Sequence, residues 1–135
     1  MRLLQDDVIF KGDILYRGKN LYSINKEGMR KVRGKEIGMI LQNPGSSLNP
    51  GLNVGSQIAE SFMLHKKVKS SLAIEMAKEL LGRVKLKESS KRVKEYPHQY
   101  SGGMKERAVI AMGIASEPRF IIADEPTKGL DVTVK

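Results

Sequence analysis

The sequence predicts an α/β fold in which a run of helices lies between two short apolar strands. Residues 37–41 and 120–123 are short apolar runs with the length of strands. Helical periodicity and capping residues occupy much of the segment between them. The second run ends in Asp124-Glu125-Pro126, which is how a buried strand ends when its carboxyl edge holds a metal and a water.

The composition is that of an ordinary globular domain. The chain has 135 residues, of which 40% are hydrophobic and 29% charged, so we expect one domain at most. No apolar run approaches the ~20 residues of a membrane span, and no segment resembles a signal peptide, so we expect a cytosolic chain unless a partner brings it to a membrane. Cysteine is absent, which excludes disulfides and thiolate metal sites, and His65 and His98 are too isolated to suggest a metal site.

The net charge of +9 is concentrated in one segment. Residues 66–94 hold ten basic and three acidic side chains. We favour a solvated helical face, because only 5% of the chain is aromatic and this segment offers no platform on which bases could stack. Attraction to anionic lipid headgroups or to a nucleic acid backbone are the alternatives.

The first third of the chain predicts short strands and one short helix. Residues 8–10 and 14–16 favour strands with turns between them. Asn25 is placed to cap a helix that runs to about Val32. The strand at 36–41 should end at Gln42-Asn43-Pro44-Gly45, where proline and glycine force the chain out of the sheet.

The middle of the chain predicts consecutive helices. Asn53 can cap a helix to about His65, and Ser70 or Ser71 can start the next. That second helix carries an apolar stripe composed of Leu72, Met76, Ala77, Leu80, Leu81 and Val84. A third, short helix is expected over residues 89–94, before Tyr96-Pro97 stops it.

A fourth helix should begin at Ser101-Gly102-Gly103. Ser101 is a natural N-cap, and apolar residues recur at helical spacing from 102 to about 116. Free backbone N–H groups, the positive end of the helix dipole and a serine hydroxyl would then meet at one point. Because Gly102 and Gly103 lack side chains, a phosphate could approach this backbone closely.

Taken in order, these stretches resemble the ATP-binding subunits of ABC transporters. Residues 100–104, Tyr-Ser-Gly-Gly-Met, resemble the family's signature motif. Residues 120–125 resemble its Walker B strand with the catalytic glutamate, residues 129–131 its D-loop, and Gln42 its Q-loop glutamine. Ser-Leu-Asn-Pro at 47–50 and Tyr-Pro-His-Gln at 96–99 narrow the resemblance to the subgroup that serves oligopeptide, dipeptide and nickel importers.

The resemblance implies an incomplete P-loop NTPase (ABC ATPase) core sheet with an inserted all-helical subdomain. Residues 1–45 would form a partial antiparallel and core sheet region that ends in the Q-loop. Residues 46–116 would form the helical subdomain, which ends in the signature helix, and residues 117–135 the Walker B strand and D-loop.

It also implies a composite nucleotide site. Ser101, Gly102 and Gly103 would bind the γ-phosphate of ATP held by another subunit, because the family's two ATPase subunits pair head to tail. The alternative is a capped helix start without a ligand. Tyr100 and Met104 replace the commoner leucine and glutamine of the signature.

The remaining roles concern Mg²⁺ and the attacking water. Asp124 would hold Mg²⁺, Gln42 would hold it by its carbonyl oxygen and sense the water, and Glu125 would act as general base. Asp131 would shape the nucleotide site at the dimer interface, in a D-loop where Gly129 replaces the usual alanine. Without the family, these residues would indicate a loop glutamine and solvated acidic turns.

Two family motifs are absent from these residues: the Walker A loop, Gly-x-x-x-x-Gly-Lys-Ser/Thr, and the C-terminal switch histidine. We therefore expect a fragment or a truncated chain, with exposed sheet edges that favour self-association. We also expect these 135 residues alone to bind ATP weakly or not at all, and not to hydrolyse it. An assay with Mg²⁺ that finds turnover abolished by Glu125→Gln would contradict this expectation.

The function expected from the sequence is that of an ATP-binding subunit of an importer for peptides or nickel, peripheral on the cytoplasmic face of the membrane. Its expected partners are a second ATP-binding subunit and transmembrane permease subunits, and no nucleic acid is expected. Two alternatives stay open: a non-catalytic docking module derived from such a subunit, and a basic nucleic-acid-binding protein.

Overall fold

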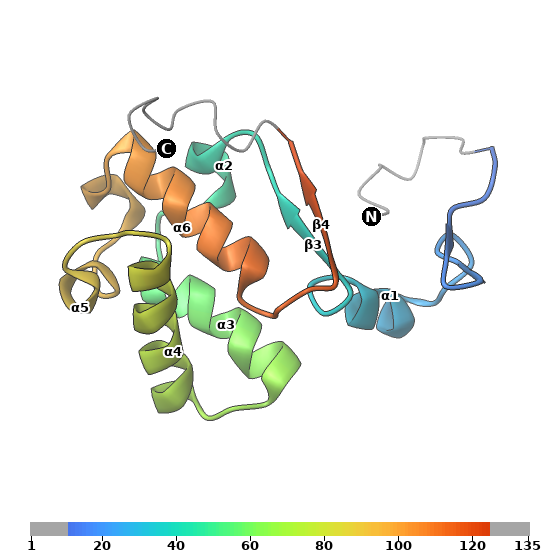
Figure 1. The fold of residues 1–135 in the computed structure, drawn as a ribbon, viewed down its shortest axis with the longest axis horizontal. Coiled ribbons are helices and arrows are strands. Elements are labelled where there is room, and N and C mark those ends of the chain that lie inside the picture. The colour runs from blue at the N-terminus through green and yellow to red at the C-terminus, as the bar shows by residue number, and fades with distance from the viewer. Residues whose placement is uncertain (1–10, 125–135) are drawn as a thin grey trace.

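The computed structural model describes residues 11–124 and shows a helical bundle beside a pair of parallel strands, with a small hairpin at the opposite end (Figure 1). The elements in chain order are β1 (Leu15–Tyr16), β2 (Lys19–Asn20), α1 (Lys26–Val32), β3 (Ile37–Ile40), α2 (Pro44–Ser47), α3 (Val54–Lys66), α4 (Ser70–Arg83), α5 (Ser89–Arg92), the 3-10 turn η1 (Pro97–Gln99), α6 (Gly102–Ile114) and β4 (Phe120–Ala123). The mixed α/β fold predicted from the sequence is confirmed.

β1 and β2 form an antiparallel hairpin. Leu15 pairs with Asn20, and Tyr16 pairs with Lys19. Arg17 and Gly18 between them both have positive φ, at 49° and 73°, which matches the twist that two-residue hairpins require. The strand expected at 14–16 is therefore present, its partner β2 was missed, and the strand expected at 8–10 lies outside the described residues.

β3 and β4 are parallel neighbours, although the whole helical insertion separates them in the sequence. Ile37 lies opposite Phe120, and Ile40 lies opposite Ala123. β3 packs inward, with Ile37, Gly38 and Ile40 buried. The expectation that β4 is a buried strand was wrong, because all four of its residues are exposed, Phe120 by 56%. The cause is that β4 pairs only with β3 within residues 11–124, so one edge and much of its apolar surface stay uncovered.

The main core lies between α3, α4 and α6. Val54, Ile58 and Leu81 are its largest fully buried side chains. α3 is capped by the Asn53 side chain, which accepts a hydrogen bond from the backbone N–H of Ser56 at 2.8 Å, as the sequence predicted. The predicted stripe on α4 was wrong at Leu72, which is 52% exposed.

The buried face of α4 keeps Ala77, Leu80 and Leu81 of the predicted stripe and has Ala73 in place of Leu72. Ala73, Ala77, Leu80 and Leu81 face the core, because α4 packs along α3 at these positions and turns Leu72 outward. The start of α4 is as expected, although no side chain caps it. α5 ends two residues before the expected boundary, and α6 ends at Ile114 where 116 was expected.

α2 is a helix that the sequence did not predict. Asn43 caps it by accepting a hydrogen bond from the backbone N–H of Gly45 at 3.0 Å, and Pro44 occupies its first turn. Proline is compatible with that place, because the first turn of a helix has no intrahelical partner for an N–H. Pro44 therefore leads the chain out of the sheet and directly into a turn of helix.

α1 covers a second, smaller core. Leu21, Met29 and Ile37 are its buried members. Asn25 accepts a hydrogen bond from the backbone N–H of Gly28 at 2.8 Å, which confirms the predicted cap. None of the helices in the described part of the chain is long and apolar enough to cross a membrane.

Candidate nucleotide site

The parallel pairing brings two predicted site residues to one edge of the sheet. The backbone N–H of Asp124 donates to the carbonyl of Ile40 at 3.0 Å. Asp124 comes directly after β4, and Gln42 is the second residue after the end of β3. Both residues are exposed. Glu125 and Asp131 lie outside the described residues, so their predicted roles rest on the sequence alone.

The oxygen atoms at this edge suit Mg²⁺. A carboxylate and a side-chain carbonyl are ligands that Mg²⁺ prefers, and protein sites for it commonly offer one or two carboxylates and leave the other positions to phosphate and water. Within residues 11–124 no group of three His, Cys, Asp or Glu side chains could enclose a metal by itself. Asp124 and Gln42 carry oxygen donors of the kind that Mg²⁺ takes, and their role as its ligands stays a prediction.

Ser101 begins α6 as the sequence predicted. Its backbone is extended, with φ −66° and ψ 167°, and its Oγ accepts a hydrogen bond from the backbone N–H of Met104 at 3.4 Å. Ser101 and Gly102 are exposed. The start of a thirteen-residue helix, with its free N–H groups and positive dipole end, is thus open to an anion.

Within residues 11–124, no close contact and no positive φ requires glycine at positions 102 and 103. A Cβ atom built on either residue would meet nothing within 4 Å, and neither has a positive φ. By contrast, a Cβ on Gly113 would lie 2.7 Å from Ile40 Cγ1, and one on Gly38 would lie 2.5 Å from the Gly113 carbonyl. Glycine costs a helix about 0.5–1 kcal/mol relative to alanine. The pair at 102 and 103 therefore leaves the backbone open to a close approach, which is the role predicted from the sequence.

Gly38 and Gly113 let α6 lie close against β3. This contact places the start of α6 on the same side of the molecule as the carboxyl ends of the strands, toward the top in Figure 1.

A cavity of about 10 Å³ remains between α6 and the loop after β3, lined by Gln42, Glu106 and apolar side chains. Glu106 Oε2 is buried there without a hydrogen-bond partner in the part of the chain that the structure describes. Sequence reasoning missed Glu106, which carries no motif signal of its own.

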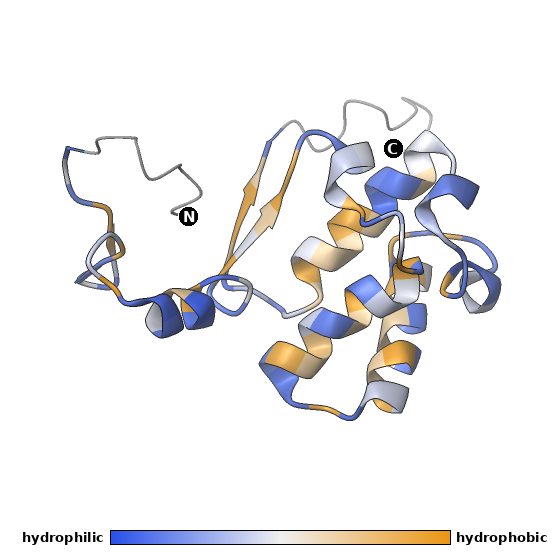
Figure 2. Cartoon of the chain, turned by 180° about the vertical axis from the view of Figure 1, so that it is seen from behind, coloured by the Kyte–Doolittle hydropathy of each residue, from blue (hydrophilic) through white to orange (hydrophobic). Residues whose placement is uncertain are grey.

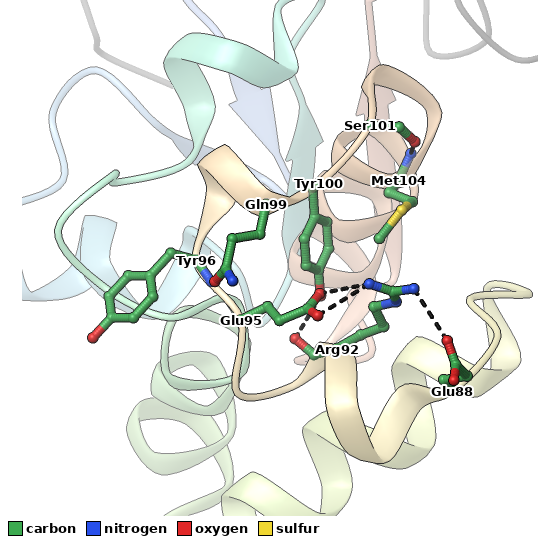
Figure 3. A network of polar contacts seen from close by, with 8 residues as sticks. All are labelled: Glu88, Arg92, Glu95, Tyr96, Gln99, Tyr100, Ser101 and Met104. Carbon is green, nitrogen blue, oxygen red and sulfur yellow. Dashed lines mark hydrogen bonds and ion pairs between the residues drawn. The ribbon is translucent and has the colours of Figure 1, made fainter.

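A partly buried polar network lies at the turn that leads into α6 (Figure 3). Arg92 Nη1 donates to both carboxylate oxygens of Glu95, at 3.0 and 2.8 Å, and Arg92 Nη2 donates to Glu88 at 3.1 Å. The Tyr100 hydroxyl donates to the Arg92 carbonyl at 2.8 Å. Because Tyr100 directly precedes the helix cap, these bonds anchor the residue next to Ser101. Arg92 and Glu95 were not predicted as supports for the site.

Tyr100 should titrate unusually late. Burial, and then the nearby Glu95 carboxylate, raise the pKa of Tyr100 to about 12. Its folded-state pKa thus exceeds the ordinary 10.0, so the protonated Tyr100 hydroxyl stabilises the fold. This stabilisation is complete below pH 10 and is lost as the pH rises towards 12. Absorbance of ionised tyrosine should show a late step that is lost in Tyr100→Phe. Burial also raises the pKa of Tyr16, so a second ionisation step at high pH, that of Tyr16, should remain in the variant. A titration curve of Tyr100→Phe identical to that of the wild type would contradict the assignment to Tyr100.

Comparisons with known proteins identify the family of the chain. The family model described as ABC transporter matches residues 2–128, and the chain belongs to that family. The oligopeptide transport ATP-binding protein OppD of Bacillus subtilis is 49% identical over 93% of this chain and 35% of its own length. The dipeptide transport ATP-binding protein DppD of Lactococcus lactis is 44% identical over 93% of this chain and 36% of its own length. The chain thus spans about a third of these relatives.

Solved structures give the same fold. One is a dimeric structure of a post-hydrolysis state of the ATP-binding cassette MJ0796 bound to ADP and Pi. It matches 90% of this chain and 52% of its own, with a TM-score of 0.79 and 25% identity. A second dimeric structure of MJ0796, described as a bacterial ABC transporter cassette, matches with a TM-score of 0.77 and 26% identity, over 90% of this chain and 51% of its own. The predicted ABC ATPase fold is therefore confirmed.

Proposed function

We propose that this chain is part of an ATP-binding subunit of an ABC importer that takes up peptides. Its relatives are named as oligopeptide and dipeptide transport proteins, and they supply the substrate class. Nickel appears in neither name and stays a prediction from the sequence. The single observation that carries the ATP-binding role is the pair of helical glycines, Gly102 and Gly103, with open space where their side chains would be.

In this proposal the start of α6 contacts ATP held by a second ATP-binding subunit. Ser101 Oγ and the backbone N–H groups of Gly102 and Gly103 would donate to the γ-phosphate, and glycine lets that backbone approach closely. The dimeric ATP-binding cassettes among the similar structures support such a pairing. The site would be composite, with phosphate contacts from two subunits.

The residues after β3 and β4 would bind Mg²⁺ and position the water that attacks ATP. When bound, Mg²⁺ would neutralise charge on the phosphates. Asp124 and Gln42 are placed to hold it, and Glu125 would orient or deprotonate the attacking water. Asp131 would act where the subunits meet. The domain boundaries after residues 45 and 116 also remain part of the proposal.

Transmembrane permease subunits would be the other partners, and they would hold the chain at the cytoplasmic face of the membrane. Support for this comes from the transport proteins among its relatives. The helical insertion, which begins after the Q-loop, would transmit the state of the nucleotide site to the permease. An ATP-independent interaction with a permease alone would instead favour the non-catalytic docking module.

ATP-dependent association tests the composite site. The partner would be a full-length relative that has its own Gly-x-x-x-x-Gly-Lys-Ser/Thr loop and a substitution that prevents hydrolysis. Light scattering should detect a mixed complex only with ATP and Mg²⁺, and Gly103→Ala should weaken it at least tenfold because the new methyl group occupies the path of the phosphate. The same substitution should stabilise the isolated chain by about 0.5–1 kcal/mol.

Gly82→Ala is the matched control. Gly82 is a helical glycine like Gly103, although it is exposed where Gly103 is half-buried, and a Cβ on it would make only an ordinary contact, 3.8 Å from Ser89 Oγ. Both variants should therefore gain helix stability, whereas only Gly103→Ala should lose the ATP-dependent complex. Equal association of the two variants would contradict the proposed role of the glycine pair.

A further inference from the structure

The turn between α3 and α4 exposes an unusual number of large apolar side chains. Met63 and Leu64 in the last turn of α3 are 38% and 48% exposed, and Leu72 in the first turn of α4 is 52% exposed. The core-facing residues of the two helices lie on other faces, so these three add nothing to the main core. We name residues 63–72 the helical tip.

Unpaired cations lie among these apolar residues. Lys67 and Lys69 are exposed, and neither forms an ion pair with any residue between 11 and 124. Lys67 adopts the left-handed conformation, with φ 55°, and this ends α3 and turns the chain into α4. Lys66, in contrast, is bound to Glu117 at 2.9 Å. The tip therefore carries two free positive charges.

The neighbouring titratable groups do not cancel this charge. Glu75 on α4 is paired with Lys78, and Glu60 lies one turn earlier on α3. His65 packs over Gly34, and burial lowers its pKa, as do the charges of Lys35 and Arg30, so it adds no charge near pH 7. The net charge of the tip stays positive.

The helical tip also projects from the molecule. In Figure 1 the turn lies at the lower edge, away from the strands, and Figure 2 shows orange and blue segments side by side there. A projecting surface with both aliphatic and cationic side chains can contact a flat surface without interference from the rest of the fold.

We propose that the helical tip binds the surface of a membrane that contains anionic lipid. Lysines near such a surface are attracted to the headgroups, and exposed aliphatic side chains gain by entering the boundary between headgroups and acyl chains. A nucleic acid backbone would satisfy only the lysines, because the tip has no Phe, Tyr or Trp on which a base could stack and its one imidazole, that of His65, packs over Gly34. The combination of leucine, methionine and lysine therefore favours lipid.

Vesicle sedimentation tests this with the 135-residue chain. Vesicles of phosphatidylcholine with phosphatidylglycerol should bind the chain at about 0.1 M salt, and phosphatidylcholine alone should bind it much more weakly. Lys67→Gln with Lys69→Gln should reduce partitioning about 25-fold, since each lysine near the surface contributes about fivefold. Leu64→Ser with Leu72→Ser should reduce it about tenfold or more.

Lys85→Gln with Lys87→Gln is the matched control. These lysines belong to the same basic segment and are also exposed, but they follow the far end of α4, about 20 Å away by helix length. Their loss should change partitioning by less than about threefold, because the separation exceeds the Debye length of about 10 Å. Circular dichroism should show that all three variants stay folded, as expected for exposed positions.

Three results would overturn the proposal: no binding to anionic vesicles, equal losses in both lysine pairs, or full binding after removal of the two leucines. Salt-dependent retention on DNA that depends on the lysines but not the leucines would favour a nucleic acid instead. The outcome is independent of the ATP-dependent complex, so failure of one proposal leaves the other intact.

Discussion

Gly55→Ala is expected to lower the free energy of unfolding by about 3 kcal/mol, the upper range for overpacking a core. Gly55 is buried at the start of α3, where a Cβ would lie 2.3 Å from the Val93 carbonyl oxygen and 2.3 Å from Val93 Cγ2. The side chain could rotate away, but the carbonyl cannot, because it accepts the Gly55 N–H at 3.0 Å. Urea unfolding monitored by circular dichroism would measure the loss.

The contact between Gly55 and Val93 also connects α3 to the segment that precedes the nucleotide site. Val54 N–H donates to the Glu95 carbonyl at 2.9 Å, so the free N–H groups at the start of α3 are satisfied by the segment that holds Arg92 and Glu95. Gly55→Ala should therefore also loosen the turn before Ser101. A loss smaller than that of a typical surface substitution, about 0.5 kcal/mol, would show that this contact is not tight in solution.

Arg92→Met is the second substitution with a large expected effect. It removes the partner of Glu95, whose side chain is only 11% exposed, and leaves a carboxylate largely out of water. Removing one member of such a buried pair costs about 3–5 kcal/mol, and the residual exposure of both side chains places the expected loss near 3 kcal/mol. The measurement is again urea unfolding at neutral pH, where the carboxylate would be charged.

Two controls isolate the buried charge as the cause. Arg92→Met combined with Glu95→Leu should recover most of the lost stability, because no unpaired carboxylate remains. Lys78→Met breaks the exposed Lys78–Glu75 pair and should cost less than about 1 kcal/mol. If the double variant were as unstable as Arg92→Met alone, the loss would instead come from the packing of the Arg92 stem.

The sequence predicted those parts of the fold that local chemistry determines. Asn25, Asn53 and Ser101 cap helices where expected, because an N-cap needs only its own side chain and the N–H groups that follow. The apolar runs at 37–41 and 120–123 were predicted as strands from their length and composition, whereas their parallel pairing was not predicted. The place of Ser101 at the start of a helix, and of Gln42 and Asp124 after strands, could be predicted in the same way.

What the sequence could not predict depends on contacts between distant segments. The exposure of Phe120 depends on which strands lie beside β4, and that of Leu72 depends on how α4 is rotated against α3. Glu95 appears as one more acid in a basic segment, and only the fold reveals that it is buried against Arg92. The buried oxygen of Glu106 likewise arises from the close packing of α6 on β3. Tertiary packing decides all four.

The central claim is that the start of α6 contacts a phosphate held by a second subunit. Amide resonances of the isotope-labelled chain can test this directly in the presence of the hydrolysis-deficient relative. With ATP and Mg²⁺, the signals of Gly102, Gly103 and Met104 should shift strongly and those of Gly82 and Gly34 should not; without the second subunit, ATP should shift none of them. Unchanged signals at 102 and 103 in an ATP-bound complex would contradict the account.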